Sequence, residues 1–441
     1  MPKVFYPRVL VVNGDPFCKS SATGLTMINL FRGWPEDRLA QVFTSAFSAD
    51  FGVCTNFWRL PPLAMVSHKQ GYRVALQPAT VTTQIGPQGA NCLGNPVSAK
   101  PLAPWLGGWM RDVGREAMEL LPYQLSEDFW RWIKEFDPDV VYSYFGSIRI
   151  MRLAYQVADR LEVPIVPHFM DDWPSTIYRR FPLSLLLQRN LVLWLDRCLA
   201  FSPIRMAIGE DMAGEFAKRY GSPFLPLMNC VDDVLIDRPF VEPPERFIVR
   251  FIYVGTLYFN RWKSLCEIGR ALARLRSENI MGELIVFGSV NPGIAFERLA
   301  LLYPVVHLAG VVSSDDVPSV QNDADCLIHV ESFEPNDRLY TRLSISSKIP
   351  SYLASGRPVL AYGPSELASV RFIEETGCGQ VVVTQDEDIL AEALAKIIKS
   401  PSLRLELGRR AKVLAGVTHR ASDARNKLRS VLERAAANPD H

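Results

Sequence analysis

The stretch SSKIPSYLASGRPVLAYGPSELASVRFIEETGCGQVV, residues 346–382, decides the fold. It contains the short apolar run PVLAY (358–362) and leads into a second, GQVVV (379–383), with a segment of helical length between them. Gly356, just before the first run, is a typical residue for the end of the preceding helix. A strand, a helix and a strand in succession, with strands that are apolar throughout, indicate a parallel sheet covered by helices on both faces.

The same alternation extends over the whole chain. Between the apolar runs lie helical segments such as residues 263–277, where Leu265, Ile268 and Leu272 recur with the spacing of one helix face. The pattern predicts an α/β fold built from doubly wound parallel sheets. The other predicted strands are RVLVVNG (8–14), AQVFTS (40–45), RVALQ (73–77), DVVYSY (139–144), PIVPH (164–168), CLAFS (198–202), FLPLM (224–228), FIVRFIYVG (247–255), GELIVFG (282–288), VVHLAG (305–310) and DCLIHV (325–330).

The alternation is interrupted by DDVLIDRPFVEPPERF, residues 232–247, which is polar and contains three prolines. Such a composition is typical of a linker between domains, and a chain of 441 residues is too long for one ordinary domain. We therefore expect two Rossmann-like halves, residues 1–235 and 246–417. Residues 418–441 are expected to form one last helix beyond the second sheet.

The composition excludes several classes of protein. Lysine and arginine number 48 against 47 acidic residues, and a net charge of +1 argues against a nucleic-acid-binding protein. The eight cysteines are scattered without a CxxC pair, which is typical of reduced thiols in the cytoplasm. The N-terminus has no signal-peptide pattern, and no uninterrupted apolar run reaches the 18 residues of a membrane span.

Motifs that would assign another chemistry are absent from the sequence. It contains no GxGxxG dinucleotide fingerprint, no GxSxG, no Walker A and no HExxH pattern. The pairs Asp137/Asp139 and Asp323/Asp325 resemble metal-binding DxD pairs. Each pair precedes an apolar strand, however, where a polar turn is expected anyway. We therefore expect no metal site.

A glycine and basic residues follow a predicted strand of the second half. Gly255 ends the run FIVRFIYVG, and Arg261 and Lys263 open the next predicted helix. A glycine lets the backbone approach a ligand, and basic side chains at a helix N-terminus suit a diphosphate. The alternative is a pair of solvated charges. Because the carboxyl ends of parallel strands share one rim, the predicted ligand site also includes Lys348, Gly363, Ser365 and Glu366.

Polar residues also follow the predicted strand PIVPH of the first half. His168, Asp171 and Asp172 lie in PHFMDDWPSTIY (167–178), and carboxylates at a strand end are costly unless they are solvated or used. A structural role is the alternative for the histidine. Gly24 lies in the loop after the first strand, where we expect backbone groups that polarise a substrate.

Two segments depart from the regular pattern. Residues 80–104 have no periodicity and precede tryptophan-rich sequence, which suits either an insertion over a core or a mobile acceptor-binding lid. Residues 182–198 contain more leucines than one helix face needs, beside Arg179, Arg180 and Arg189. This second segment is either a helix buried on both sides or one that lies on anionic lipid.

Taken together, these segments resemble the GT-B glycosyltransferases, in particular the retaining group that uses nucleotide-sugar donors. The resemblance implies a donor in the second half, an acceptor in the first half, and a reaction in the cleft between them. It also implies that the final helix crosses back to the first half. The segments that carry the resemblance are DPDVVYSYFG (137–146), VPIVPHFMDDWP (163–174), residues 201–233, VGTLYFNRWKSL (254–265), VHLAGVVSSDDVPSVQNDADCLIHV (306–330) and residues 346–382.

The chain departs from the family pattern on the donor side. Thr256 stands where an arginine usually follows the strand-end glycine, so that Arg261 and Lys263 take the later basic positions. Ser351 stands where the family has a glutamate that contacts the nucleotide ribose. These changes permit a weakened or altered activity.

The resemblance also implies catalytic groups. The glutamate that touches the donor sugar has Glu331 and Glu334 as candidates. The catalytic-face histidine corresponds to His168, or Asp171 occupies its position, and His168 or Asp172 would orient the sugar or the acceptor.

The expected function is therefore retaining glycosyl transfer in the synthesis of a cell-surface polysaccharide or glycoconjugate. The expected partners are a nucleotide sugar and a glycan, lipid-linked or small-molecule acceptor, without nucleic acid, metal or another cofactor, and the oligomeric state stays open. We expect a cytoplasmic protein that can also lie on the inner face of the plasma membrane. The alternatives are a GT-B nucleotide-sugar epimerase and a nucleotide-binding partner protein that has lost its chemistry.

Overall fold

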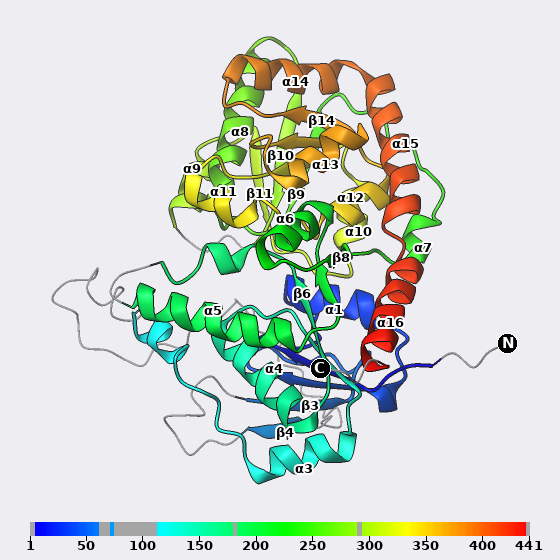
Figure 1. Cartoon of the computed structure of the whole chain (residues 1–441). Helices are drawn as coiled ribbons and strands as arrows, with labels where there is room; N and C mark the ends of the chain where they lie inside the picture. The colour runs from blue at the N-terminus through cyan, green and yellow to red at the C-terminus, as the bar shows by residue number, and fades with distance from the viewer. Residues whose placement is uncertain (1–4, 61–70, 75–112, 180–182, 289–292, 438–441) are drawn as a thin grey trace, which may run out of the picture.

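A computed structural model of the chain describes residues 5–60, 71–74, 113–179, 183–288 and 293–437. Two β-sheets form the centres of two halves, which lie one above the other in Figure 1. The first sheet has eight strands in the order β4-β3-β2-β1-β5-β6-β7-β8, and the second has six in the order β11-β10-β9-β12-β13-β14. The predicted α/β fold with two Rossmann-like halves is confirmed.

All strand pairs are parallel except β3 with β4, which is antiparallel. The strands of the first sheet are β1 (Val9–Asn13), β2 (Leu39–Phe43), β3 (Asn56–Arg59), β4 (Tyr72–Val74), β5 (Val140–Ser143), β6 (Ile165–Phe169), β7 (Arg205–Ala207) and β8 (Phe224–Pro226). Those of the second are β9 (Val249–Val254), β10 (Gly282–Phe287), β11 (Val306–Gly310), β12 (Cys326–Val330), β13 (Val359–Tyr362) and β14 (Gly379–Val382).

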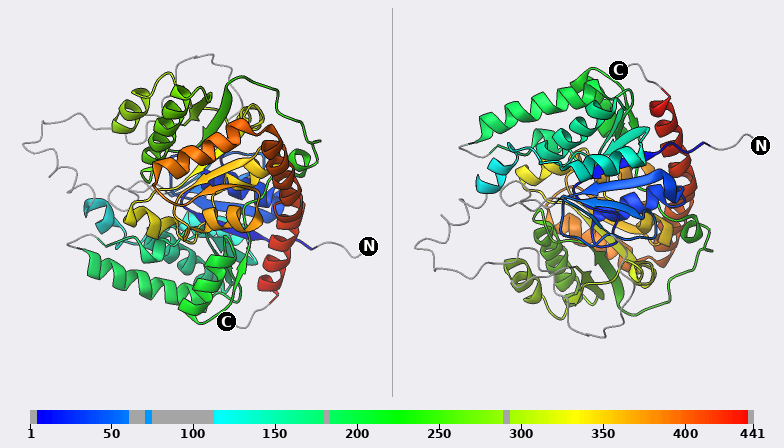
Figure 2. Two further views of the ribbon diagram at one scale, coloured as in Figure 1. Left: turned by 90° about the horizontal axis from the view of Figure 1, so that it is seen from above. Right: turned by 90° about the horizontal axis from the view of Figure 1, so that it is seen from below.

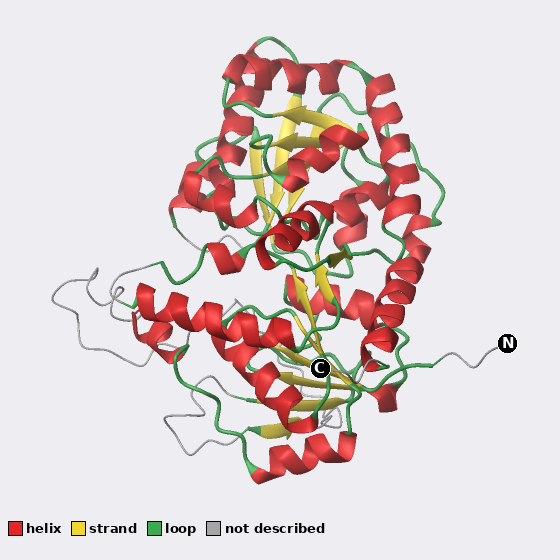
Figure 3. Ribbon diagram, in the orientation of Figure 1, coloured by secondary structure: helices red, strands yellow, loops and turns green. Residues whose placement is uncertain are grey.

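Helices cover both faces of each sheet (Figure 3). The helices that precede β9 are α1 (Ala22–Phe31), α3 (Glu127–Phe136), α4 (Ile148–Leu161), α5 (Ser184–Ala200), α6 (Glu210–Tyr220) and α7 (Asp233–Ile236). Those that follow it are α8 (Arg261–Ser277), α9 (Ile294–Ala300), α10 (Val317–Asn322), α11 (Pro335–Thr341), α12 (Ile349–Ser355), α13 (Ala368–Thr376), α14 (Glu387–Lys399), α15 (Pro401–Thr418) and α16 (Ala421–Ala436).

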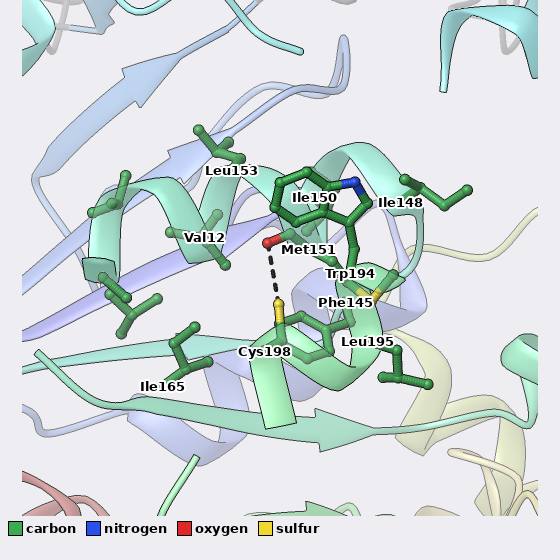
Figure 4. Packing of buried hydrophobic residues seen from close by; sticks show 14 of the residues in the cluster. Val12, Phe145, Ile148, Ile150, Met151, Leu153, Ile165, Trp194, Leu195 and Cys198 are labelled. Atoms are coloured by element: carbon green, nitrogen blue, oxygen red, sulfur yellow. Dashed lines mark hydrogen bonds between the residues drawn. The ribbon is translucent and has the colours of Figure 1, made fainter. Parts of the chain in front are cut away.

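Each sheet lies between two hydrophobic cores, because its strands are apolar on both sides. In the first half, α3, α4 and α5 pack on one face, and α1 and α16 on the other. In the second half, α8 and α14 pack on one face, and α12 and α15 on the other. Figure 4 shows α5 against α4, where the Cys198 thiol donates a hydrogen bond to the Met151 carbonyl oxygen at 3.4 Å. Among the described residues, seven cysteines are buried free thiols.

One local prediction was wrong. Residues 198–202 do not form a strand, because Cys198 continues the buried stripe of α5 and the helix ends only at Ala200. The next strand is β7, and the unpredicted β3 pairs with β2. The aperiodic segment 80–104 lies outside the described residues.

The chain passes between the halves twice. It crosses first between β8 and α7, since α7 already packs against α12 and α15 of the second half, and it returns through the junction of α15 and α16. At this junction Arg420 forms a β-bridge with Val231, and the Arg425 Nε donates to the Asn29 carbonyl oxygen at 2.8 Å. Figures 1 and 2 show α16 beside the first half, so the predicted crossing of the final helix is confirmed. No helix in the described part of the chain is long and apolar enough to cross a membrane.

Candidate functional site

A cavity of about 480 Å³ lies between the two halves, at the carboxyl ends of their strands. Its walls in the first half come from the start of α1 and from residues that follow β5 and β6. In the second half they come from residues that follow β9 and β12 and from the start of α12. This is the position where open parallel sheets bind ligands. The predicted residues that line it are Asp171, Gly255, Thr256, Arg261, Glu331, Lys348 and Ser351.

Gly255 and Lys348 fit against each other at the end of β9. A Cβ atom at position 255 would overlap the Lys348 Nζ, so that only glycine leaves room for the ammonium group. The Lys348 Nζ donates a hydrogen bond to the Tyr253 hydroxyl at 3.1 Å, and this hydroxyl donates to the Thr256 carbonyl oxygen at 2.6 Å. The glycine therefore makes space for a lysine, in addition to any close approach of a ligand.

Arg261, the first residue of α8, binds Glu331 after β12. Its Nη2 lies 3.2 and 3.0 Å from the two carboxylate oxygens, and Glu331 is buried. Burial acts to lower the pKa of the Arg261 guanidinium, but the Glu331 carboxylate outweighs it and the pKa is raised. The Arg261 Nε is also buried and has no hydrogen-bond partner among the described residues. The arginine is therefore charged, with one donor left for a ligand.

Two further groups surround the same carboxylate. Burial and the nearby Arg261 guanidinium lower the pKa of Lys348 to about 7, although Glu331 partly opposes this. Burial also lowers the pKa of His329 to about 4, and its Nε2, 3.5 Å from a Glu331 oxygen, makes no hydrogen bond within the described structure. His329 is therefore neutral, and the positive groups beside Glu331 are Arg261 and the partly protonated Lys348, whose charged form an anionic ligand would favour.

Asp171, which follows β6, connects the first half to the second. The Ser344 hydroxyl donates to its Oδ1 at 2.7 Å, and the Tyr340 hydroxyl lies 3.4 Å from its Oδ2. Burial raises the pKa of Asp171, although these two hydrogen bonds act against the shift. A carboxylate of the first half thus lies in the cleft opposite Arg261 and Glu331, held by two hydroxyl groups of the second half.

Ser351 lies on the floor of the cavity, one turn into α12. Its hydroxyl donates to the Lys348 carbonyl oxygen at 2.9 Å and accepts a hydrogen bond from the Gln321 Nε2 at 2.9 Å. The serine therefore connects the start of α12 to α10.

Four of the predicted donor residues do not line the cavity. Lys263 forms an ion pair with Glu334, and Glu366 forms one with Arg338. A Cβ atom at Gly363 would lie 2.9 Å from the Glu331 Cβ, so this glycine makes room for the glutamate from behind. Ser365 is exposed in the loop before α13.

His168 lies inside the first half, which corrects its prediction as a catalytic residue. The Leu227 carbonyl oxygen, 3.1 Å from Nε2, can only accept, so Nε2 carries the proton and Nδ1 accepts from the Tyr142 hydroxyl at 2.7 Å. Burial lowers the pKa of His168 to about 3 and keeps the ring neutral. Both ring nitrogens are satisfied within the core.

Asp172 and Gly24 are also committed to the structure of the first half. Arg219 donates to both Asp172 oxygens, at 2.7 and 3.1 Å, in a contact that lies away from the cleft. Gly24 lies in the first turn of α1, where a Cβ atom would come 2.5 Å from the Cys18 carbonyl oxygen. Its N–H donates to the Ser21 hydroxyl and is not available to a substrate. Thr23, its neighbour, does line the cleft.

The cleft continues into the first half as a second cavity of about 460 Å³. The two cavities share Thr23, Tyr144, Asp171 and Tyr340, among others. The second also has aromatic and charged walls, which include Tyr123, Trp173, Glu119 and Arg149. A ligand in the second half and another in the first half would therefore meet at Asp171. In the described part of the chain, no cluster of three or more His, Cys, Asp or Glu residues could hold a metal ion.

No protein-family model and no curated protein sequence matches the chain. Solved structures match over nearly the whole chain. Anabaena HepE in complex with UDP and glucose has a TM-score of 0.60 at 14% identity, covering 97% of this chain and 100% of that one. Sucrose-phosphate synthase from Thermosynechococcus elongatus has a TM-score of 0.57 at 14% identity, with 97% and 98% covered. A glycosyltransferase from Rickettsia africae has a TM-score of 0.61 at 11% identity, with 98% and 100% covered.

These similarities extend over both halves and the cleft between them, and they agree with the two parallel sheets and the returning final helix. The chain therefore has the GT-B fold.

Proposed function

We propose that this protein is a glycosyltransferase that moves a sugar from a nucleotide-diphosphate sugar to an acceptor held by the first half. The observation that carries the proposal is the meeting of Arg261 and Lys348, which come from two different βα units, in the cleft of a GT-B fold. HepE has the same fold, and its structures contain UDP and UDP-glucose. This supports a nucleotide-sugar donor at the equivalent cleft here.

The two basic residues would stabilise the leaving group. As the bond between the sugar and the diphosphate breaks, negative charge grows on the phosphate oxygens, and fixed positive groups lower the barrier. The unpartnered Arg261 Nε and the Lys348 ammonium supply this charge. Glu331 holds Arg261 in position and contacts the sugar, while Thr256 and Ser351 lie beside the nucleoside.

The acceptor would enter through the second cavity and meet the donor at Asp171. A carboxylate at this point can orient an acceptor or sugar hydroxyl, and its contacts to Tyr340 and Ser344 close the cleft around the reactants. Retention of configuration and a role in cell-surface polysaccharide or glycoconjugate synthesis belong to the proposal and rest on the sequence resemblance. So does independence from a metal ion, since the basic residues take the role of the cation.

A membrane surface is part of the same proposal, because α5 presents an apolar outer face. Leu185, Leu186 and Leu193 are 73%, 49% and 45% exposed, so the interpretation of this helix as buried on both sides was wrong. Arg189 and Arg179 are exposed beside these leucines, a combination that suits anionic lipid. The helix lies along the outer side of the first half (Figure 1), so a lipid-linked acceptor could reach the cleft from the membrane.

The donor is tested by thermal unfolding with UDP-, GDP-, dTDP- and ADP-sugars. A ligand at a hundred times its Kd stabilises the protein by about 2.7 kcal/mol, which raises Tm by about 5–10 °C for domains of this size. No shift with any of them at millimolar concentration would overturn the proposal. A changed sugar without any acceptor would indicate an epimerase, and nucleotide binding without turnover a non-catalytic partner protein.

The membrane contact is tested by flotation with vesicles that contain phosphatidylglycerol. We expect the wild-type protein to float and Leu185→Glu/Leu186→Glu to remain in the aqueous fraction. Arg270→Glu on α8, an exposed residue on the other half, is the matched control and should float. Equal flotation of wild type and the double variant would exclude α5 as the contact.

A further inference from the structure

A third cavity, of about 360 Å³, lies at the junction of the two halves. It shares Gln321 and Ser351 with the cleft, and the hydrogen bond between these two residues forms part of the wall between the cavities. Its other walls come from the connecting segment after α7, from α10 and α12, and from Lys412 of α15. We call it the junction cavity.

The junction cavity is basic. Arg238, Arg357 and Lys412 line it, and its described lining contains no carboxylate. The Arg357 guanidinium donates to the carbonyl oxygens of Asn322, at 2.6 and 3.1 Å, and of Val241, at 2.8 Å. These neutral acceptors satisfy its hydrogen bonds, and the carboxylates that act on its charge, Asp325 and Asp323, lie outside the described lining of the cavity.

Lys412 is held in the same way. Its ammonium donates to the carbonyl oxygens of Leu235 at 2.8 Å and Ala354 at 2.6 Å. Burial lowers the pKa of Lys412, and repulsion from Arg238 lowers it further. Arg238 itself is exposed and has no ion-pair partner among the described residues. Two cations therefore repel each other across this cavity.

The nearest carboxylates already have partners. Asp323 and Asp325 act on Arg357, but Arg246 donates to Asp323 at 2.5 Å and lies 3.5 Å from Asp325. Asp237 acts on Lys412 and accepts a hydrogen bond from Arg420 at 2.6 Å. The carboxylates near the junction cavity thus also face other cations, and none of them is part of its described lining.

The position of the cavity connects it to the movement of the two halves. The chain crosses between the halves just before α7 and again where α15 meets α16, and both α7 and α15 contribute walls, through Leu235 and Lys412 (Figure 1). Ser351, in the shared wall, donates to the Lys348 carbonyl oxygen. A ligand here would touch the two helices next to these crossings and α12, whose N-cap is Lys348.

We propose that the junction cavity binds a small phosphorylated metabolite, which regulates the enzyme by changing how the two halves close. A phosphate monoester carries close to two negative charges at neutral pH and suits the three cations that line the cavity, while Leu235, Pro239 and Ala354 offer an apolar wall for its carbon body. The regulatory effect rests on the proposed transferase function, whereas the binding itself does not.

Binding is measured by titration calorimetry of the full chain with glucose 6-phosphate and inorganic phosphate. All variants are made in an Arg261→Ala/Lys348→Ala background, so that ligand binding in the cleft does not contribute to the measured heat. We expect glucose 6-phosphate to bind this background protein, and Arg238→Glu to weaken the binding at least tenfold. Arg434→Glu, which reverses an exposed charge on α16, is the matched control and should bind normally. Lys412→Met is the second test, used only if its Tm matches the background.

The outcomes separate the two parts of the proposal. No binding to the background, or unchanged binding in both Arg238→Glu and Lys412→Met, overturns the site. Binding that leaves the transfer rate of the wild-type protein within twofold overturns the regulation. An Arg238→Glu protein that keeps Arg261 and Lys348 should still bind a nucleotide sugar. If neither this variant nor the wild-type protein binds one, the proposed function fails, whatever the junction cavity binds.

Discussion

The two strand rims that face the cleft use their polar residues differently. In the first half, His168 and Asp172 have partners for their polar atoms: a hydroxyl and a carbonyl for the histidine, and Arg219 and a serine for the aspartate. In the second half, the Arg261 Nε and the His329 Nε2 have no hydrogen-bond partner in the described structure. Buried polar groups are normally paired, so the unpaired ones beside Glu331 suit a ligand; in the first half the Trp173 Nε1, which lines the second cavity, is unpaired as well.

The largest expected effect on turnover comes from substitutions at the strand rim of the second half. Arg261→Ala or Lys348→Ala removes a charge-assisted contact to the leaving group, which contributes about 1.5–3 kcal/mol. We expect turnover to fall about 10- to 150-fold, with a smaller change in substrate binding. Steady-state kinetics on folded variants measures this.

Lys263→Ala is the control for those two variants. Lys263 also lies in the first turn of α8, but it pairs with Glu334 outside the cleft, so turnover should stay within about threefold of wild type. The reverse pattern, with Lys263→Ala impaired and the other two normal, would place the diphosphate elsewhere.

A substitution at the strand rim of the first half should lower stability and leave turnover unchanged. His168→Gln disturbs two buried hydrogen bonds, and an unsatisfied buried group costs about 1–3 kcal/mol. Urea unfolding should show this loss, while kcat of the folded protein is unchanged. Tyr142→Phe, which removes the partner hydroxyl, should destabilise as well. A His168→Gln protein with normal stability and a low kcat would show that this histidine is a catalytic residue.

The pH dependence of donor binding sharpens the contrast between the rims. In the free protein the pKa of Lys348 is about 7, and a bound diphosphate would raise it. Binding then takes up a proton above pH 7, so affinity should fall as pH rises from 7 to 9, by at most about tenfold per pH unit. The other groups around Lys348 are Arg261, Glu331, Tyr253 and His329.

Calorimetry with a nucleotide sugar, whose phosphates do not titrate in this range, measures the effect. The Lys348→Arg protein is the control, because its guanidinium stays charged and should remove the pH dependence. A dependence that persists in this variant would assign the proton to another group.

The smallest expected effect concerns metal ions. If the basic residues of the second rim balance the diphosphate, removal of divalent ions by EDTA should leave turnover within about twofold of its starting value. Loss of activity that magnesium or manganese restores would show that Asp171 or Glu331 works together with a cation.

The sequence predicted the architecture well, because a strand buried on both faces must be apolar throughout. It failed at residues 198–202, where the last buried residues of α5 have the same composition as a strand. Only the continued spacing from Leu191 through Leu195 to Cys198 distinguishes the two, and this would have assigned the segment to the helix.

Only part of the site could be predicted from the sequence, because not every site residue stands out from its neighbours along the chain. Arg261 and Lys348 stand out because they are charged and precede helices, next to strand ends. His329 was missed because it lies within the apolar run of β12, one residue before its end. The neighbours Asp171 and Asp172 look equivalent in sequence, and only the fold decides that the first meets Ser344 across the cleft while the second meets Arg219.

The fit of Gly255 against Lys348 has a consequence for the evolution of such sites. Because the ammonium fills the place of a side chain at 255, neither position can change freely while the other stays. Gly255→Ala should be harmful beside Lys348 and less harmful beside a short residue, which relieves the overlap but not the strain of a side chain at a φ of +156°, so the two substitutions are expected to be non-additive. In other chains with this cleft, a side chain at the strand-end position would then predict that the lysine has been replaced.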